Sequence, residues 1–206
     1  MLIKVILSVL AGYLLGSFNA ALIVGKVFYN KDIRDYGSGN AGTTNVLRTF
    51  GKAAAAAVLA MDILKGILAC LAGQLLTGNI ENIGWAGMYL AGFAAVIGHN
   101  WPVFFGFKGG KGVLTSFAVI LYISPVPALI CLAVFIGIVS FTGYVSLGSI
   151  IAAIVWLVMS VFFDLPALML VIAVLMVVMI IIRHKENITR LFRGTEKKIS
   201  FKKTPG

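Results

Sequence analysis

Long apolar runs constrain this chain more than any other feature of its sequence. A helix needs about 20 mostly apolar residues to cross the hydrocarbon core of a bilayer. Runs of this kind cover Leu2–Phe28, Ala53–Leu76, the slightly short Ile83–Gly98, and two longer stretches, 113–142 and 146–182. Hydrophobic residues make up 60% of the 206 residues and charged residues only 12%, against roughly 45–50% and about 25% in soluble domains. The sequence therefore excludes a water-soluble globule and predicts an all-α integral membrane protein.

The two longer stretches each contain helix-breaking residues. Asp164-Leu165-Pro166 interrupts 146–182 and predicts two helices joined by a tight turn. Ser124, Pro125 and Pro127 lie near the middle of 113–142, which is too long for one straight span and too short for two full ones. The length of 113–142 alone does not decide whether this stretch crosses the membrane once or twice.

The distribution of charge decides it. Lys and Arg next to membrane spans collect on the cytoplasmic side, and 15 of the 17 basic residues lie in the polar segments 26–52, 99–112 and 183–203. All three segments share one side only if 113–142 crosses and returns as two short helices kinked at Ser124–Pro127. The sequence thus predicts about seven transmembrane helices, with the N-terminus outside and the C-terminus in the cytoplasm. We expect a single domain, 1–206, with a basic cytoplasmic tail, 193–206, and no nucleic-acid partner.

Few polar residues lie inside the apolar runs. Asp62 and Lys65 are three residues apart, and because buried charge is expensive in lipid, we expect them to neutralise each other facing the bundle. A structural and a catalytic role both remain open for this pair. Cys70 and Cys131 lie in apolar surroundings, where they are expected to act as small hydrophobic residues rather than as a disulfide or a metal site.

The first polar segment contains a glycine-rich stretch, Tyr36–Asn45, followed by Arg48. Glycines allow positive φ angles, and a loop rich in N–H and hydroxyl donors can form a nest around a phosphate. A flexible solvated connector is the alternative interpretation. Arg48 favours anion binding, because its planar guanidinium matches phosphate oxygens.

The second polar segment, Gly98–Gly112, superficially resembles a nucleotide-binding P-loop, but its glycine spacing and the residue after Lys111 do not fit that motif. Lys111 between glycines still fits a second anion contact. His99 is open to three interpretations: a general base, a phosphate donor or an interfacial polar residue. Four aromatic residues are typical of an interfacial belt or of a path for an acyl chain: Trp101, Phe104, Phe105 and Phe107.

The third polar segment is Arg183–Leu191. If it is helical, His184 and Asn187 share one face and point toward the other two segments. The three segments contain no carboxylate pair and no zinc-type cluster, and no carboxylate is identifiable that would orient a histidine as in a catalytic triad. The residues alone thus indicate a membrane protein that binds phosphorylated species on its cytoplasmic face, with enzyme and transporter both open.

Three motifs, in this order, resemble the bacterial acyl-phosphate:glycerol-3-phosphate acyltransferases of the PlsY type. The similarity covers nearly the whole chain and is carried by Gly37–Asn45, by Gly98–Gly112, and by Arg183–Leu191 with Gly194–Glu196 after it. Two positions depart from the family pattern. Asn19 stands where Pro is expected, which bears on the bend of the first helix, and Lys185 replaces a usual Arg.

The resemblance implies transfer of a fatty acyl group from acyl phosphate to the 1-hydroxyl of glycerol 3-phosphate. The products would be lysophosphatidic acid and phosphate, in the first acylation step of bacterial phospholipid synthesis. Neither acyl-CoA nor acyl-carrier protein would be used directly, and no cofactor or metal is implied. The location would be the bacterial inner (plasma) membrane as a multi-pass protein, among membrane lipids, with transient contact to the enzyme that makes acyl phosphate.

The resemblance also assigns residues to the site. The catalytic residues would be Ser38, Arg48, Lys111 and Asn187. Substrate binding would involve Gly37, Gly39, Asn40, Gly42, Thr43, Asn45, His99, Lys108, Gly109, Gly110 and His184. Since phosphate is already a good leaving group, the enzyme mainly needs positioning and charge stabilisation, and we expect direct transfer without an acylated Ser38. The acceptor of the hydroxyl proton stays open among Ser38, His99 and a substrate phosphate.

The sequence disfavours two other classes of function, an anion transporter and a non-catalytic membrane scaffold. An anion transporter would need a matching site on the outer face, where the sequence places almost no charge. A non-catalytic membrane scaffold would not need three loops rich in glycine and amide groups.

Overall fold

The computed structural model describes residues 1–80 and 85–199, and its regular elements are all helices, as predicted. Within these ranges, ten α-helices and two short 3₁₀ turns follow one another in this order: α1 (Leu2–Ser17), α2 (Ala20–Tyr29), η1 (Ile33–Asp35), α3 (Thr43–Phe50), α4 (Lys52–Thr77), α5 (Ala86–Asn100), η2 (Val103–Phe105), α6 (Val113–Ile123), α7 (Pro125–Thr142), α8 (Val145–Phe162), α9 (Ala167–Arg183) and α10 (Lys185–Phe192).

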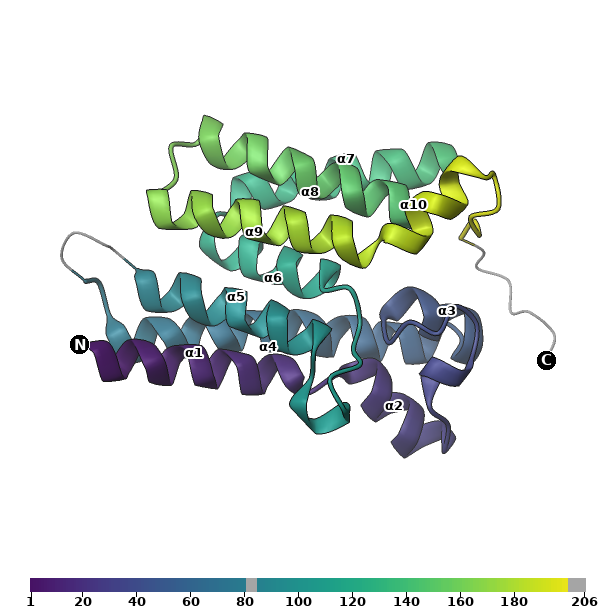
Figure 1. Ribbon diagram of the computed structural model, residues 1–206, viewed down its shortest axis with the longest axis horizontal. Helices are drawn as coiled ribbons and strands as arrows, with labels where there is room; N and C mark the ends of the chain where they lie inside the picture. Colours follow the sequence, from purple (N-terminus) through teal and green to yellow (C-terminus); the bar gives the residue numbers. More distant parts are fainter. Residues whose placement is uncertain (81–84, 200–206) are drawn as a thin grey trace.

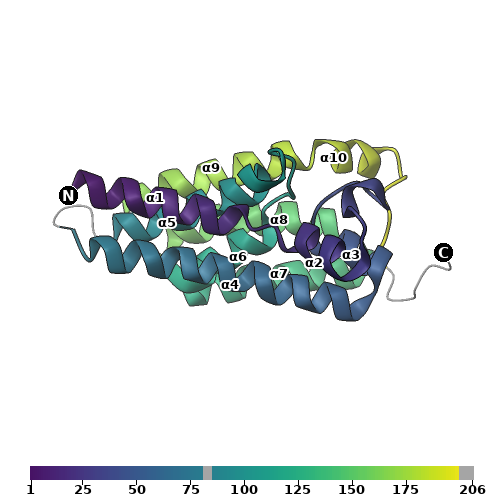
Figure 2. The ribbon, with the colours of Figure 1, turned by 90° about the horizontal axis from the view of Figure 1, so that it is seen from below.

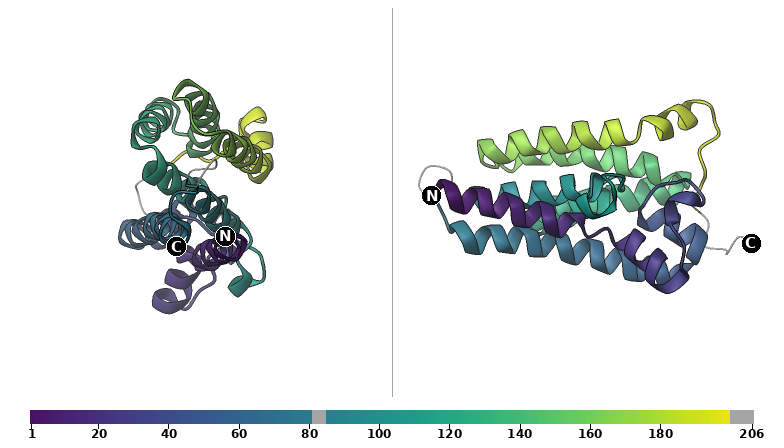
Figure 3. Two further views of the ribbon diagram at one scale, coloured as in Figure 1. Left: turned by 90° about the vertical axis from the view of Figure 1, so that its left-hand side faces the viewer. Right: turned by 60° about the horizontal axis from the view of Figure 1, so that its bottom comes forward.

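The long helices run along a common axis in two groups (Figure 1). Helices α1, α4 and α5 form one group and α7, α8 and α9 the other, with α6 between them, as the end-on view in Figure 3 shows. The N-terminus lies at one end of the long axis, whereas α3 and α10 lie at the opposite end (Figures 1 and 2). The first and third polar segments of the sequence, far apart along the chain, are thereby brought to one end of the molecule.

Small residues allow α1 and α5 to pack backbone to backbone. A Cβ atom added at Gly12 would lie 2.1 Å from the carbonyl oxygen of Ala91, and one at Gly16 would lie 2.0 Å from that of Ala95. Helices inside a bilayer associate through such close packing because lipid provides little hydrophobic drive between them. This contact fixes α5, and with it the second polar segment, relative to α1.

The first apolar run, predicted as one span over Leu2–Phe28, is divided between α1 and α2 by a break at Phe18 and Asn19. The Asn19 side chain is fully buried and caps α2 by accepting a hydrogen bond of 3.1 Å from the backbone N–H of Leu22. Its amide nitrogen donates to the carbonyl oxygen of Ala41, 3.4 Å away in the glycine-rich loop. The bend therefore forms with Asn in place of Pro, and this Asn also ties the bend to the loop.

The other boundaries mostly follow the sequence. Helix α4 matches the predicted span Ala53–Leu76, and the break between α8 and α9 falls at the predicted turn. The predicted start of the third span, Ile83, lies outside the described residues, and α5 runs from Ala86 to Asn100. The prediction of two short helices in 113–142 holds only for α6, which has 11 residues; α7 has 18. Pro125 starts α7 at its first turn, where proline is favoured, so the rest of the stretch is helical.

Four described segments are long and apolar enough to cross a membrane: Leu2–Tyr29, Lys52–Thr77, Pro125–Thr142 and Val145–Phe162. Helices α9 and α10 pass the same test together but meet at a bend of 58°. Large apolar side chains cover the outer surface of these helices, with Phe141 93% and Phe162 80% exposed. An apolar exterior of this extent suits contact with lipid tails. Seven spans and the orientation of the termini stay predictions.

Candidate active site

A cavity of about 720 Å³ is lined by residues of α3 to α10 and of the three polar segments. One part, which we call the polar end, is formed where the three segments meet: Ser38, Asn40, Thr43, Arg48, His99, Lys111, His184, Asn187, Arg190 and Glu196. The other part, which we call the apolar channel, runs between α6, α7, α8 and α9: Phe117, Ile120, Leu132, Phe135, Trp156, Val177 and Ile180. A charged group and a long apolar chain could thus occupy one continuous space.

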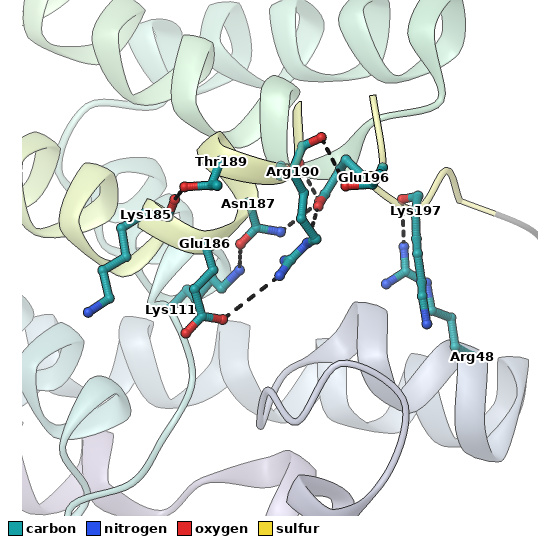
Figure 4. Close-up of polar contacts among 11 residues, drawn as sticks. Arg48, Lys111, Lys185, Glu186, Asn187, Thr189, Arg190, Glu196 and Lys197 are labelled. Carbon is teal, nitrogen blue, oxygen red and sulfur yellow. Dashed lines mark hydrogen bonds and ion pairs between the residues drawn. The ribbon is translucent and has the colours of Figure 1, made fainter. Parts of the chain in front are cut away.

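A chain of hydrogen bonds orders the polar end (Figure 4). The ammonium of Lys111 donates to the side-chain oxygen of Asn187, and the amide nitrogen of Asn187 donates to Glu196 Oε1 at 2.6 Å. Glu196 also accepts from Arg190 Nε and from Ser146 Oγ, each at 2.7 Å. The carboxylate accepts only, so it fixes the Asn187 amide with its nitrogen toward Glu196 and its oxygen toward Lys111.

The charge state of this chain follows from its burial and its hydrogen bonds. Burial lowers the pKa of Lys111 to about 8, although the nearby carboxylate of Glu196 opposes the shift. Burial alone would raise the pKa of Glu196, but the hydrogen bonds from Asn187, Arg190 and Ser146 outweigh it and leave the pKa below its usual value. At neutral pH the site therefore presents an ammonium close to its titration range, as is typical of functional sites.

Arg48 reaches the polar end from α3. Its Nη2 atom donates to the carbonyl oxygen of Lys197 at 3.0 Å (Figure 4). Burial lowers the pKa of Arg48, but a guanidinium stays charged at any ordinary pH. Because a guanidinium has five N–H donors, Arg48 can hold the segment around Lys197 and still donate to an anion in the cavity.

The glycine-rich loop is tied down by one buried amide. Asn45 is 1% exposed, and its side-chain oxygen accepts the backbone N–H of Ser38 at 2.9 Å. Its nitrogen donates to the carbonyl oxygens of Ile33, at 3.1 Å, and of Tyr36, at 2.9 Å. Such an anchored loop fits a built binding site better than a solvated connector. It also means that the Asn45 amide is occupied in holding the loop that carries Ser38.

Side chains of α5 and α9 contact the backbone of the second polar segment and hold it in place. Arg183 donates from Nη2 to the carbonyl oxygens of Gly110, at 2.6 Å, and of Gly109, at 3.2 Å. A Cβ atom at position 110 would lie 2.2 Å from His99 Nε2. Glycine is therefore needed here so that the segment leading to Lys111 can pass over the His99 ring.

The structure brings most of the predicted site residues together around the cavity: Gly37, Ser38, Asn40, Gly42, Thr43, Asn45, Arg48, His99, Lys111, His184 and Asn187. Gly39, Gly109 and Gly110 are not among the lining residues. Lys108 lies away from the cavity, in a separate depression with Asp32 and Arg34, and Arg34 donates to its carbonyl oxygen at 3.1 Å. None of the four aromatic residues between 101 and 107 lines the cavity, so the belt interpretation suits them better than an acyl path.

Sequence reasoning missed the partners of two acidic residues at this site, Asp62 and Glu196. Glu196 was recognised only as part of a motif, because nothing in the sequence indicates that Ser146 and Asn187 converge on it. The sequence identified no carboxylate that would orient a histidine as in a triad, and in the structure Asp62 Oδ1 lies 3.6 Å from His99 Nδ1, beyond ordinary hydrogen-bond range. The predicted pair of Asp62 and Lys65 is confirmed, with 2.7 Å between the charged atoms. Its spacing gave no sign that His99 from α5 would join it.

Comparison with known proteins decides the class of protein. A family model described as glycerol-3-phosphate acyltransferase matches residues 6–194. The chain belongs to this family. It is 44% identical over 197 residues to a glycerol-3-phosphate acyltransferase of Thermoanaerobacter sp. (strain X514), covering 96% of both chains. It is 45% identical over 194 residues to glycerol-3-phosphate acyltransferase 2 of Bacillus anthracis, covering 94% of this chain and 98% of the relative.

Two solved structures share the fold of this chain. Both are of PlsY (YgiH), an integral membrane glycerol 3-phosphate acyltransferase, in its glycerol 3-phosphate form and its lysophosphatidic acid form. The first is 39% identical, with a TM-score of 0.88 over 95% of this chain and 96% of that one. The second is 38% identical, with a TM-score of 0.85 over 96% of each. Membership of an enzyme family favours a catalytic site over a transport path for the cavity.

Proposed function

We propose that this protein transfers a fatty acyl group from acyl phosphate to the 1-hydroxyl of glycerol 3-phosphate, forming lysophosphatidic acid and phosphate. The observation that carries the proposal is the continuous cavity, whose polar end holds Arg48 and Lys111 and whose other part is an apolar channel. Both substrates carry phosphate, and one carries a chain that matches the channel.

The donor is inferred from the chemistry of the polar end. Arg48, Lys111 and Arg190 all line it, and three cations suit two phosphate groups better than one. The phosphate of an acyl phosphate is itself the leaving group, so cations positioned on it stabilise the charge that develops as it departs. Acyl transfer then needs no cofactor at this site.

The reaction balances as one displacement. The 1-hydroxyl oxygen of glycerol 3-phosphate bonds to the acyl carbon, the bond from that carbon to the phosphate oxygen breaks, and phosphate leaves with the electron pair. In the net reaction, the hydroxyl proton ends on the released phosphate. Lys111, aligned by Asn187 and Glu196, stabilises the departing phosphate, and Arg48 binds phosphate oxygens. Ser38 donates a hydrogen bond to phosphate or to the acyl carbonyl without forming a bond to carbon.

Reconstitution tests the proposal directly. Purified protein in lipid receives labelled glycerol 3-phosphate with a synthetic acyl phosphate or, separately, with the matching acyl-CoA, in the absence of metal and nucleotide. The expected result is labelled lysophosphatidic acid and one phosphate per product with acyl phosphate only. The double variant Arg48→Ala/Lys111→Ala provides the inactive control. Equal use of acyl-CoA, or no product from acyl phosphate, would overturn the proposed donor.

The proposal includes the topology. We place seven membrane segments in the bacterial plasma membrane, with the N-terminus outside and the polar end at the cytoplasmic face. Single cysteines at Phe107 and Lys185, both exposed positions, are introduced after Cys70 and Cys131 have been replaced by Ala. An impermeant maleimide should label them only after the membrane is permeabilised. Labelling in intact cells would reverse the orientation, while a cysteine at Leu2 provides the opposite pattern as a control.

A further inference from the structure

A buried cluster of three ionisable side chains includes His99 of the polar end. Asp62 and Lys65 come from α4 and His99 from α5, and they are 1%, 6% and 4% exposed. Lys65 Nζ lies 2.7 Å from Asp62 Oδ1, as an ion pair, and 2.9 Å from His99 Nδ1. It also donates to the carbonyl oxygen of Phe18 at 3.3 Å. His99 and Asp62 both line the cavity.

The number of protons on Lys65 determines the direction of its contact with His99. Beside a buried carboxylate at 2.7 Å, Lys65 is held as an ammonium, because a neutral amine would leave the carboxylate as an unpaired buried charge. An ammonium has three N–H donors and no acceptor. Its three neighbours, Asp62, Phe18 and His99 Nδ1, each offer a lone pair. The contact of 2.9 Å is therefore a hydrogen bond from Lys65 to His99.

The opposite arrangement does not fit the distances. A proton on His99 Nδ1 would point at a donor 2.9 Å away, and its alternative acceptor, Asp62 Oδ1, lies at 3.6 Å, outside ordinary hydrogen-bond range. A neutral histidine carries its single proton on one ring nitrogen. With Nδ1 accepting from Lys65, that proton belongs on Nε2.

The other ring nitrogen of His99, which lines the cavity, lies beside the segment that leads to Lys111. His99 Nε2 lies beside Gly110, where a Cβ atom would come within 2.2 Å of it, and this residue immediately precedes Lys111. Among the described residues, the polar contacts of the His99 ring all involve Nδ1. Nε2 is thus left to interact with a molecule bound in the cavity.

We infer that Asp62 and Lys65 are positioning residues that fix His99 in its Nε2–H tautomer, so that this ring presents one neutral hydrogen-bond donor to a substrate phosphate and no base. The inference rests on the proposed function and deepens it. It gives the buried pair a function, since Lys65 sets the proton position on a ring that contacts substrate, in the way that a partner on one histidine nitrogen determines the state of the other. Of the three interpretations that the sequence leaves open for His99, it selects the phosphate donor.

The direct test is nitrogen NMR of protein whose histidine rings are labelled with ¹⁵N. The chain has 2 histidines, and a His184→Gln variant identifies the signals of His99. In the wild-type protein without substrate, proton–nitrogen correlations should show a protonated Nε2 and an unprotonated Nδ1. A proton on Nδ1 would overturn the inference whatever the activity, and activity of the same sample with acyl phosphate tests the proposed function separately.

A double-mutant cycle adds a functional readout that a merely structural role would not produce. The variant Asp62→Leu/Lys65→Met removes both charges together, which avoids an unpaired buried ion. It should mix the two His99 tautomers and lower kcat/KM for glycerol 3-phosphate about tenfold, the equivalent of one hydrogen bond to a charged group. Lys26→Met, an exposed lysine outside the cavity, should leave kcat/KM unchanged.

The second arm of the cycle uses His99→Gln, which keeps an amide N–H but has no tautomers. In that background, Asp62→Leu/Lys65→Met should cause little further loss, because no proton position remains to be fixed. An equal tenfold loss in both backgrounds would show that the pair only supports the fold, and would contradict the positioning role. If the double variant does not fold, the tautomer measured in the wild-type protein still decides the question.

Discussion

The two parts of the cavity offer a ligand opposite kinds of contact. At the polar end, each side chain is oriented by the next one: Glu196 orients Asn187, which orients Lys111. The apolar channel is lined by aromatic and branched side chains, such as Phe135 and Trp156, from four helices. Directional contacts fail when one atom is lost, because the partners are then left unpaired. Apolar contacts weaken in proportion to the area lost. Single substitutions should therefore lower activity strongly at the polar end and only gradually in the apolar channel.

The largest effect is expected at the polar end. Arg48→Ala and Lys111→Ala should each remove a charge-assisted contact worth about 1.5–3 kcal/mol, which corresponds to roughly a ten- to hundredfold loss in kcat/KM. Arg48→Lys should not recover full activity, because an ammonium cannot replace the planar fork. Steady-state kinetics in lipid measures the loss in kcat/KM, once each variant has been shown to stay folded in detergent. Lys185→Ala, at an exposed position on α10, is the matched control, and near-normal turnover in both alanine variants would remove the two cations from the site.

The pH dependence of kcat/KM should report the titration of Lys111 at the polar end. The pKa of Lys111 is lowered by burial to about 8, so the ammonium is present below that pH and is lost above it. Because kcat/KM reports the free enzyme, it should fall about tenfold per pH unit above 8. The fall in kcat should occur at higher pH, since bound phosphate stabilises the ammonium. Lys111→Arg should abolish the limb near pH 8 even if its overall rate is low, and a limb that persists in this variant would assign it to another group.

The apolar channel should respond less and in a graded way. Ala153 on α8 lines the channel, and Ala153→Phe should shorten the space for an acyl chain. We expect selectivity to move toward shorter acyl phosphates, by about fourfold for each methylene that no longer fits, from about 0.8 kcal/mol per CH₂. Competition between acyl phosphates of different length measures the shift. Val158→Phe, on the same helix but 54% exposed, should leave the preference unchanged, and an equal shift in both variants would argue against this channel as the chain site.

The same contrast separates what the sequence could predict from what it could not. Spans were predictable because the bilayer imposes length and apolarity locally, so the limits of α4 and the turn at Asp164–Pro166 could be placed from composition. It was also predictable that residues of one motif lie near one another at the site, because residues such as Ser38 and Arg48 are close along the chain. The convergence of Ser146 and Asn187 on Glu196 was not, since it depends on how α8 and α10 pack.

Two residues show how packing changes a role that the sequence suggests. Asn45 was expected around the phosphates, but the structure uses its amide to hold the loop that carries Ser38. Lys108 shares a motif with Lys111, yet the chain turns between them and leaves Lys108 beside Asp32 and Arg34. Motif membership therefore indicates which segment approaches the cavity. Which of its side chains enters the cavity depends on the turn.

We expect acyl transfer to be direct, with both substrates bound in one cavity. The most direct test is to incubate the purified protein with radiolabelled acyl phosphate in the absence of glycerol 3-phosphate and to search for acylated protein by peptide mass analysis. Direct transfer predicts no stable label on Ser38, no stoichiometric release of phosphate until glycerol 3-phosphate is added, and a lowered rate in Ser38→Ala. A stable acyl group on Ser38 together with ping-pong kinetics would contradict it.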